Sequence, residues 1–492
     1  ANNMVLAYTR DLSWKDHVIY YEELSKITKE DLVAFANKHY KENYAVVYKR
    51  TGKDPNIQKV EKPQITKVPL NREDRSELHV KLANQETVKL QPKFLDYKTD
   101  LEFFNIGPLE VIYKENTDND LFELTYHFNY GKNQDPKIEL AASLMNYVGA
   151  GNLSPEELKT EFYKLGAGYN FSTSTDGEET QITLSGLSEN MEASIKLFES
   201  LLENPVGTQD ALDKLVGRIL KSRSDAKKNK NLILSRQLFA YGKYGEVNPA
   251  SNVLTSEELM KVNVAELTDR IKELTKKQHR ILFYGNQDEK TLTNLVNTYH
   301  KIPESLKEVS DAQTYSEKNY DKEYVFWTHF DMVQTEIILL SKQELLDNAK
   351  TAAIRLFNQY FGGGMNSIVF QEIREAQGLA YSVYSAYRQG NKPDRSDYLL
   401  SYIGIQSKKK KEALSSMFSL INNLPESPQA FEIGKQAILN KIESERITKA
   451  GVLYNYLSAE KRGIDYDIRE KVYNEVKAMD LEKLFEFHET YI

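Results

Sequence analysis

The feature that most constrains this chain is internal repetition. A stretch beginning at Glu22, EELSKITKEDLVAFANKHYKENYAVVYKRTG, matches one beginning at Glu257, EELMKVNVAELTDRIKELTKKQHRILFYGNQD. Apolar residues recur at the same spacing in both stretches, which predicts an amphipathic helix and then a short strand, Ala45–Tyr48 or Ile281–Tyr284. The last residues, NEVKAMDLEKLFEFHETYI, repeat the helical part and stop before a strand.

Two longer segments match each other as well. Residues 120–151 and residues 331–364 both read as a strand, a polar turn, an apolar helix and a glycine-containing loop. Farther on, Tyr169 in LGAGYNFSTS stands opposite Tyr381 in QGLAYSVYSA. We therefore expect two complete repeats of about 200 residues, and residues 1–52 as the last helix and strand of an earlier repeat. Strands mixed with long helices favour an α+β fold, in which helices cover a sheet.

Composition excludes several classes of function. The net charge of −7 argues against a nucleic-acid partner, for which a basic patch is expected. The chain has no cysteine, so disulfides, thiolate zinc sites and cysteine nucleophiles are excluded. No apolar run is long enough for a membrane span, and the first residues, ANNMVLAYTRDLSW, do not resemble a signal peptide. Because there is no initiating methionine, we expect a processed or excised fragment.

A search for catalytic motifs gives little. The 8 histidines stand far apart, and there is no HExxH or HxxEH pair, so each histidine is interpreted as structural or surface-exposed. A GxSxG elbow is absent, and the glycines at 362–364 lack the spacing of a phosphate-binding or dinucleotide-binding loop. Acidic pairs such as Glu178–Glu179 are interpreted as solvated surface. The glycines are expected to form a turn shared with Gly149 and Gly151.

Arg374 and Tyr381 are the candidate functional residues. They lie in FQEIREAQGLAYSVYS, and a guanidinium and a phenol are donors suited to a peptide carbonyl or to the oxyanion that develops from it. The alternative interpretation is structural. In that interpretation Arg374 pairs with an acid such as Glu372 or Glu375, and Tyr381 is a half-buried strand residue.

The glycine-rich loop, the FQEIREAQGLAYSVYS stretch and the helix-rich tail resemble the fourth domain of the pitrilysin/insulysin-type zinc metallopeptidases, the inverted zincins. That family has four homologous domains in two halves that close around a peptide, with a sheet and helices arranged as in LuxS and the mitochondrial processing peptidase. The resemblance implies that 1–52 end the second domain, 53–91 link the halves, 92–305 form the third domain and 306–492 form a truncated fourth domain. It also implies that Arg374 and Tyr381 contact the substrate backbone.

The family's catalytic motif, HxxEH with a downstream glutamate, would belong to a first domain that precedes this sequence. In the third domain the matching residues are LAASL, Leu140 to Leu144, so leucines replace both histidines and Ser143 replaces the glutamate. The resemblance thus implies zinc in the intact enzyme, with ligands outside this chain, and no metal bound by these residues.

The resemblance implies the C-terminal half of a zinc metalloendopeptidase that binds a peptide in an enclosed chamber and depends on an N-terminal catalytic half. Alone, the chain would be inactive. The alternative is a non-catalytic scaffold or peptide-binding subunit of the same family. The lack of cysteine and the Lys-, Asn- and Tyr-rich composition favour a bacterial periplasm or cell envelope, although the compartment stays open.

Overall fold

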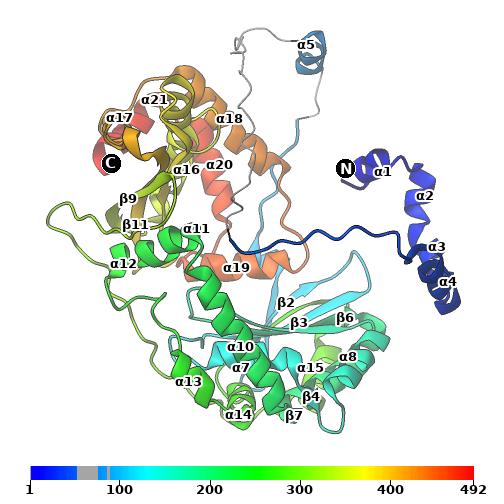
Figure 1. The fold of residues 1–492 in the computed structure, drawn as a ribbon. Coiled ribbons are helices and arrows are strands. Elements are labelled where there is room, and N and C mark those ends of the chain that lie inside the picture. The colour runs from blue at the N-terminus through cyan, green and yellow to red at the C-terminus, as the bar shows by residue number, and fades with distance from the viewer. Residues whose placement is uncertain (1, 53–75, 86–88) are drawn as a thin grey trace. The chain divides into compact units, whose positions relative to one another are not determined.

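A computed structural model describes residues 2–52, 76–85 and 89–492 (Figure 1). The chain divides into two compact units, Ala1–Glu86 and Thr87–Ile492. Most of the linker expected at 53–91 lies outside the described residues, namely 53–75 and 86–88. The described part of that segment includes a short helix, α5 (Glu77–Ala83).

The first unit consists of helices with almost no core. Its other helices are α1 (Asn2–Thr9), α2 (Trp14–Val18), α3 (Tyr20–Ser25) and α4 (Lys29–His39). Ala7 is its one buried apolar residue among those described. The strand expected at Ala45–Tyr48 is wrong, because residues 43–50 form no strand. Val47 is 92% exposed there, and a strand needs a neighbouring strand to accept and donate its backbone hydrogen bonds.

The second unit contains a six-stranded sheet in the order β1-β2-β8-β3-β6-β5. Its strands are β1 (Glu102–Ile106), β2 (Leu109–Glu115), β3 (Leu121–Phe128), β5 (Gly168–Thr173), β6 (Thr180–Leu187) and β8 (Arg280–Gly285). The strand expected at Ile281–Tyr284 is confirmed as β8, which pairs parallel to β2 and antiparallel to β3. A separate pair joins β4 (Gly149–Ala150) and β7 (Pro205–Val206).

Helices cover one face of this sheet, as the apolar periodicity predicts. They are α7 (Ile138–Leu144), α8 (Pro155–Lys164), α9 (Met191–Glu203), α10 (Gln209–Ala226), α13 (Ser256–Lys261), α14 (Val264–Leu274) and α15 (Glu289–Tyr299). On β8, Ile281 and Phe283 point into the core shared with these helices, whereas Leu282 and Tyr284 point to the opposite face. Side-chain alternation along the strand therefore makes two apolar faces, and each needs a cover.

The second sheet is smaller. Its three strands, β9 (Gln334–Leu345), β10 (Ala380–Arg388) and β11 (Ser396–Gln406), are antiparallel in the order β10-β11-β9. The helices around it are α16 (Thr351–Phe361), α17 (Lys410–Asn422), α18 (Pro428–Ser444), α20 (Ile468–Ala478) and α21 (Leu481–Tyr491). A π-helix, η5 (Phe370–Ala376), precedes β10. Their shared core includes Phe357, Tyr387 and Phe487.

Both sheets follow the same path through part of the chain. The sequence β3, α7, β5, β6 gives the strand order β3-β6-β5, and the sequence β9, α16, β10, β11 gives the order β9-β11-β10. In each case the second strand of a hairpin lies between the other two strands. Sheets that combine with helices in this way form an α+β fold, as expected from the sequence.

Each sheet also receives a helix from the other part of the unit. The helix α19 (Gly451–Lys461) follows the second sheet in the chain, yet it lies beside the first sheet (Figure 1). Its Val452 and Leu453 pack with Leu282 on the open face of that sheet. The run α11 (Lys230–Leu232), η3 (Ile233–Leu238) and α12 (Phe239–Tyr244) lies against the second sheet in turn. Lys230 there forms an ion pair with Glu336 of β9.

The remaining short elements lie at connections. They are α6 (Tyr97–Asp100) and the 3₁₀ turns η1 (Met145–Tyr147), η2 (Ser188–Asn190), η4 (Asn348–Lys350) and η6 (Ser407–Lys409). In the part of the chain that the structure describes, no helix is both long enough and apolar enough to cross a membrane.

Candidate functional site

Arg374 and Tyr381 come together in space. Arg374 lies on η5 and Tyr381 near the start of β10, and the guanidinium carbon is 4.8 Å from the centre of the tyrosine ring. The same carbon is 4.6 Å from the centre of the Phe370 ring. Both distances are within the range of cation–π attraction. The guanidinium is therefore held beside two aromatic rings.

Much of the polar edge of this pair has no hydrogen-bond partner among the described residues. The Nε of Arg374 is 3.4 Å from a carboxylate oxygen of Glu375, so the acidic partner foreseen in the alternative interpretation is present. Among the described residues, neither Nη of Arg374 nor the hydroxyl of Tyr381 has a hydrogen-bond partner. These groups can donate to a molecule that lies against the site.

A β-bulge explains why Tyr381 points outward. In the pairing of β10 with β11, Ala380 lies opposite Ile405 and Ser382 lies opposite Gly404, so Tyr381 is the extra residue. Bulges re-aim a side chain and often occur next to functional sites. The Tyr381 side chain is 77% exposed, so the interpretation of it as a half-buried strand residue is wrong.

The backbone beside the site is also open. Sheet order places β10 at an edge, paired only with β11 among the described strands. An edge strand presents unpaired N–H and C=O groups to which an extended peptide can add as a further strand. Arg374 and Tyr381 therefore stand at the end of a strand that could bind a peptide backbone.

The glycine loop before the site is architectural, as expected. A Cβ on Gly362 would lie 2.1 Å from the carbonyl oxygen of Ser385 in β10, a distance that no side chain tolerates. A Cβ on Gly149, in the matching loop of the first sheet, would lie 2.0 Å from the carbonyl oxygen of Leu153. Glycine is needed in both loops because another backbone passes very close.

The residues where the resemblance places a relic of the zinc motif form part of a core. Leu140 and Leu144 on α7 are 4% and 0% exposed and pack among apolar side chains. They offer no donor atom to a metal, so this helix does not fit a zinc ion. Elsewhere in the described residues, no three His, Asp or Glu side chains gather as metal ligands would.

Two histidines that are distant in sequence meet inside the first sheet's core. Glu199 accepts a hydrogen bond from the Tyr126 hydroxyl at 2.6 Å and lies 3.0 Å from Nδ1 of His300. The His279 ring is 5.4 Å from the His300 ring, and its Nδ1 bonds the carbonyl oxygen of Lys277. All four side chains of this network are buried, which agrees with a structural role for these histidines.

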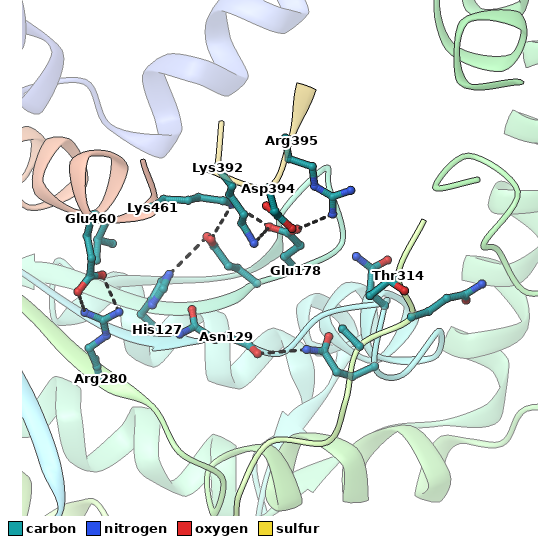
Figure 2. A pocket seen from close by; sticks show the side chains of 16 residues that line it. His127, Asn129, Glu178, Arg280, Thr314, Lys392, Asp394, Arg395, Glu460 and Lys461 are labelled. Atoms are coloured by element: carbon teal, nitrogen blue, oxygen red, sulfur yellow. Dashed lines mark hydrogen bonds and ion pairs between the residues drawn. The ribbon is translucent and has the colours of Figure 1, made fainter. Parts of the chain in front are cut away.

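Sequence reasoning missed a charged cavity of about 510 Å³ between the two sheets (Figure 2). Lys461 of α19 contacts Asp176, Glu178 and Glu179, at 2.9, 3.1 and 3.0 Å. Glu178 also pairs with Lys392 at 2.6 Å, as Figure 2 shows. The interpretation of Glu178–Glu179 as solvated surface is therefore wrong, because the fold brings cations from two distant segments onto them.

Two carboxylates that contact Lys461, those of Glu179 and Asp176, are held in the charged form. A hydrogen bond from His127 is the main cause that lowers the pKa of Glu179 to about 2, and Lys461 adds to it. Burial raises the pKa of Asp176, but hydrogen bonds from Ser174 and Lys461 outweigh burial and lower that pKa to about 2. The cavity is thus lined by fixed ion pairs, including one between Arg280 and Glu460.

Comparison with known proteins bears on the resemblance found in the sequence. Residues 261–437 match the model described as the peptidase M16 inactive domain. This part of the chain is therefore similar to the peptidase M16 inactive domain. The resemblance found in the sequence is thereby confirmed, and the matched region contains both Arg374 and Tyr381.

The relatives of this chain have different names. The non-peptidase homolog YmxG of Helicobacter pylori is 23% identical over 405 residues, a match that covers 78% of this chain and 89% of that protein. An uncharacterized zinc protease of Rickettsia felis is 23% identical over 266 residues, covering 52% of this chain and 61% of that protein. The chain is therefore similar both to a protein named a zinc protease and to one named a non-peptidase homolog.

A solved structure shares the fold. The periplasmic protease PqqL of Escherichia coli superposes with a TM-score of 0.64 at 13% sequence identity, and the match covers 98% of this chain and 53% of PqqL. The chain therefore spans about half the length of PqqL.

Proposed function

We propose that this chain is the C-terminal, non-zinc half of a zinc metalloendopeptidase. In this proposal it binds an extended peptide and donates hydrogen bonds to the scissile region, while the zinc ligands lie in an N-terminal half that carries HxxEH. The observation that carries the proposal is the pairing of Arg374 with Tyr381 at an open sheet edge, within the matched M16 region. The length of PqqL, about twice the match, supports the existence of another half.

The architecture supports the same proposal. The shared strand order of the two sheets agrees with two homologous repeats, residues 92–305 and 306–492, the second of them truncated. Residues 1–52 would be the tail of a preceding domain, and their exposed apolar side chains would be covered by the rest of that domain. Residues 53–91 would link the two halves. A peptide would then lie in a chamber between the halves.

Arg374 and Tyr381 would act on the peptide by hydrogen bonding. A peptide strand added along β10 would bring a carbonyl near the free Nη and hydroxyl groups. Donors placed where negative charge develops on that oxygen stabilise the transition state more than the ground state. The chain alone would bind peptide without hydrolysing it, and the compartment proposed is the bacterial periplasm or cell envelope.

The first experiment measures binding by the full chain. Fluorescein-labelled, unfolded casein serves as the probe, and fluorescence anisotropy gives the Kd. We expect Arg374→Ala to weaken binding by about tenfold or more, since hydrogen bonds from a charged group are among the stronger ones. The matched control is Arg218→Ala, because Arg218 also stacks on a tyrosine, with its guanidinium carbon 4.6 Å from the Tyr147 ring. Equal Kd values for the wild type and Arg374→Ala would refute the proposal.

The second experiment adds the half that carries HxxEH, taken from the coding sequence upstream of Ala1. In the combined enzyme we expect Arg374→Ala and Tyr381→Phe each to lower kcat on casein by about 10²–10³, the usual cost of losing one oxyanion donor. Near-normal turnover by both variants would show that these residues do not take part in catalysis.

A second candidate function is a non-catalytic scaffold or peptide-binding subunit. The similarity to a homologue named a non-peptidase favours it. In that case casein binding would still depend on Arg374, but no upstream HxxEH would exist and the chain with its partners would not hydrolyse casein. The coding sequence upstream of Ala1 therefore separates the two candidates.

A further inference from the structure

The guanidinium of Arg374 lies near two aromatic side chains of different exposure. Tyr381 is 77% exposed and projects from a bulge, so its ring is free to move when a ligand binds. Phe370 is only partly exposed and stands at the start of η5, four residues before Arg374. Of the two rings, Phe370 is therefore the one that can hold the guanidinium in a fixed place.

The backbone geometry of η5 supports this arrangement. The turn is wider than an α-helical turn: the amide of Gln377 bonds the carbonyl oxygen of Glu372, five residues earlier, at 3.1 Å. π-helical turns are rare and occur often at functional sites. At its end the amide of Leu379 bonds the carbonyl oxygen of Ile373 at 3.0 Å, which ties the turn to the start of β10.

Contact with a ring leaves the hydrogen-bonding edge of the guanidinium available. A guanidinium carries five N–H donors in one plane, and an aromatic ring attracts the cation through its face. Glu375 lies near Nε, and both Nη groups lack a partner among the described residues. A ring that fixes the plane without using the Nη donors therefore pre-organises them for a ligand.

We infer that Phe370 is a positioning residue for Arg374: its ring fixes the guanidinium so that the Nη donors face an extended peptide beside β10. This inference rests on the proposed function and deepens it. Phe370 itself need not contact the peptide, so its effect is transmitted through Arg374.

A double-mutant cycle with the full chain tests this inference. The Kd for fluorescein-labelled, unfolded casein is measured for the wild type, Phe370→Leu, Arg374→Ala and the double variant. We expect Phe370→Leu to weaken binding between about twofold and 30-fold in the wild type, the range of cation–π contributions. It should change nothing in the Arg374→Ala background, because the residue through which it acts is gone.

Rescue and control variants complete the test. Phe370→Trp keeps a ring beside Arg374 and should bind casein as the wild type does. Phe103→Leu makes the same chemical change at an exposed position on β1 and should leave the Kd unchanged. Should Phe370→Leu unfold, Phe370→Trp decides the matter through the spectroscopic measurement below: an indole in place of the phenyl ring should change the Arg374 side-chain shifts, and unchanged shifts would reject the contact.

The spectroscopic measurement follows Arg374 without any ligand. In a chain labelled with ¹⁵N- and ¹³C-arginine, ring currents should shift the Arg374 side-chain signals, and Arg374→Ala identifies them by their loss. Phe370→Trp should keep a ring-current shift, whereas Phe370→Leu should reduce it.

Four results would overturn the inference. Unchanged Arg374 signals in Phe370→Leu would mean that the ring does not hold the guanidinium. Equal losses of affinity in both backgrounds would mean that Phe370 acts by itself or through the fold. Normal binding by Phe370→Leu, with weak binding by Arg374→Ala, would reject the inference and leave the proposed function standing. If Arg374→Ala also binds normally, the proposed function fails and the inference fails with it.

Discussion

At the scale of single residues, His279 shows how burial in the core creates a dependence on pH. Its ring is 6% exposed, and burial lowers its pKa from 6.5 to about 4. In the unfolded chain the same histidine takes up a proton as the pH falls below about 6.5. The folded state resists that proton, so this residue makes folding less favourable as the pH drops through the window from 6.5 to 4.

We therefore expect the free energy of unfolding to fall by up to about 3 kcal/mol from this source between pH 7 and pH 4. Urea unfolding at a series of pH values measures it. His279→Gln should flatten this part of the curve, whereas His329→Gln, at an exposed position, should leave it as in the wild type. A curve of unchanged slope in His279→Gln would contradict the assignment.

The residue scale also shows where prediction from sequence stops. The pattern of residue types identified Arg374 and Tyr381 as donors, and the structure brings them within 4.8 Å. The outward direction of Tyr381 depends on a bulge in the β10–β11 pairing, and a pairing register involves a partner strand. Phe370 was not singled out, because a phenylalanine in an apolar helical stretch reads as ordinary core.

At the scale of elements, the loop after α16 must lie very close to β10. The three glycines at 362–364 were expected to be architectural, and Gly362 shows the reason, since its Cα faces the backbone of Ser385. Any side chain there would push α16 away from the strand. The same closeness in the loop at Gly149 explains why both loops carry glycine.

We expect Gly362→Ala to destabilise the fold by about 1–3 kcal/mol, the usual cost of overpacking. The control is Gly217→Ala on the middle of α10, where a new Cβ would meet nothing within 4 Å. That substitution should stabilise the chain by about 0.5–1 kcal/mol, because alanine is the better helix former. Urea unfolding of both variants provides the comparison, and equal stabilities would refute the steric argument.

At the scale of the whole second unit, two sheets are joined by exchanged helices and by charge. Apolar residues of α19 cover the open face of the first sheet. At the end of the same helix, Lys461 binds the turn between β5 and β6 through Asp176, Glu178 and Glu179. The helix α19 belongs to the chain segment that follows the second sheet, and it is bound to the first sheet. It therefore links the two sheets.

We expect Lys461→Met to lower the free energy of unfolding by roughly 1–3 kcal/mol, because partly buried carboxylates lose their shared cation. The control is Lys214→Met, which removes an exposed pair with Asp210 and should cost at most about 0.5 kcal/mol. Urea unfolding at neutral pH measures both values. A loss no larger than that of the control would show that Lys461 does not join the two sheets.

This contribution also has a predicted pH range. Glu179 and Asp176 have folded-state pKa values lowered to about 2, so they stabilise the fold above their unfolded pKa values of 4.5 and 3.8. The stabilisation is lost as the pH falls towards 2. The difference between the wild type and Lys461→Met should therefore stay constant from about pH 5 to neutral pH and shrink below about pH 4.

The sequence by itself determined what depends on local pattern. Apolar spacing predicted the strand at Ile281–Tyr284, the helices and the α+β class, because the period of apolar residues reflects which face an element buries. The leucines at 140 and 144 excluded a metal site on α7, because a donor atom that is absent from the sequence cannot be supplied by folding.

The tertiary structure alone decided what depends on a partner. Ala45–Tyr48 has the composition of a strand but forms none, since no neighbour among the described residues supplies its hydrogen bonds. Glu178 and Glu179 lie in a charged cavity and not on a solvated surface, because α19 and a distant loop bring cations to them. Contacts between residues so far apart in the chain carry no local signal, because each side chain would look the same in sequence without its partner.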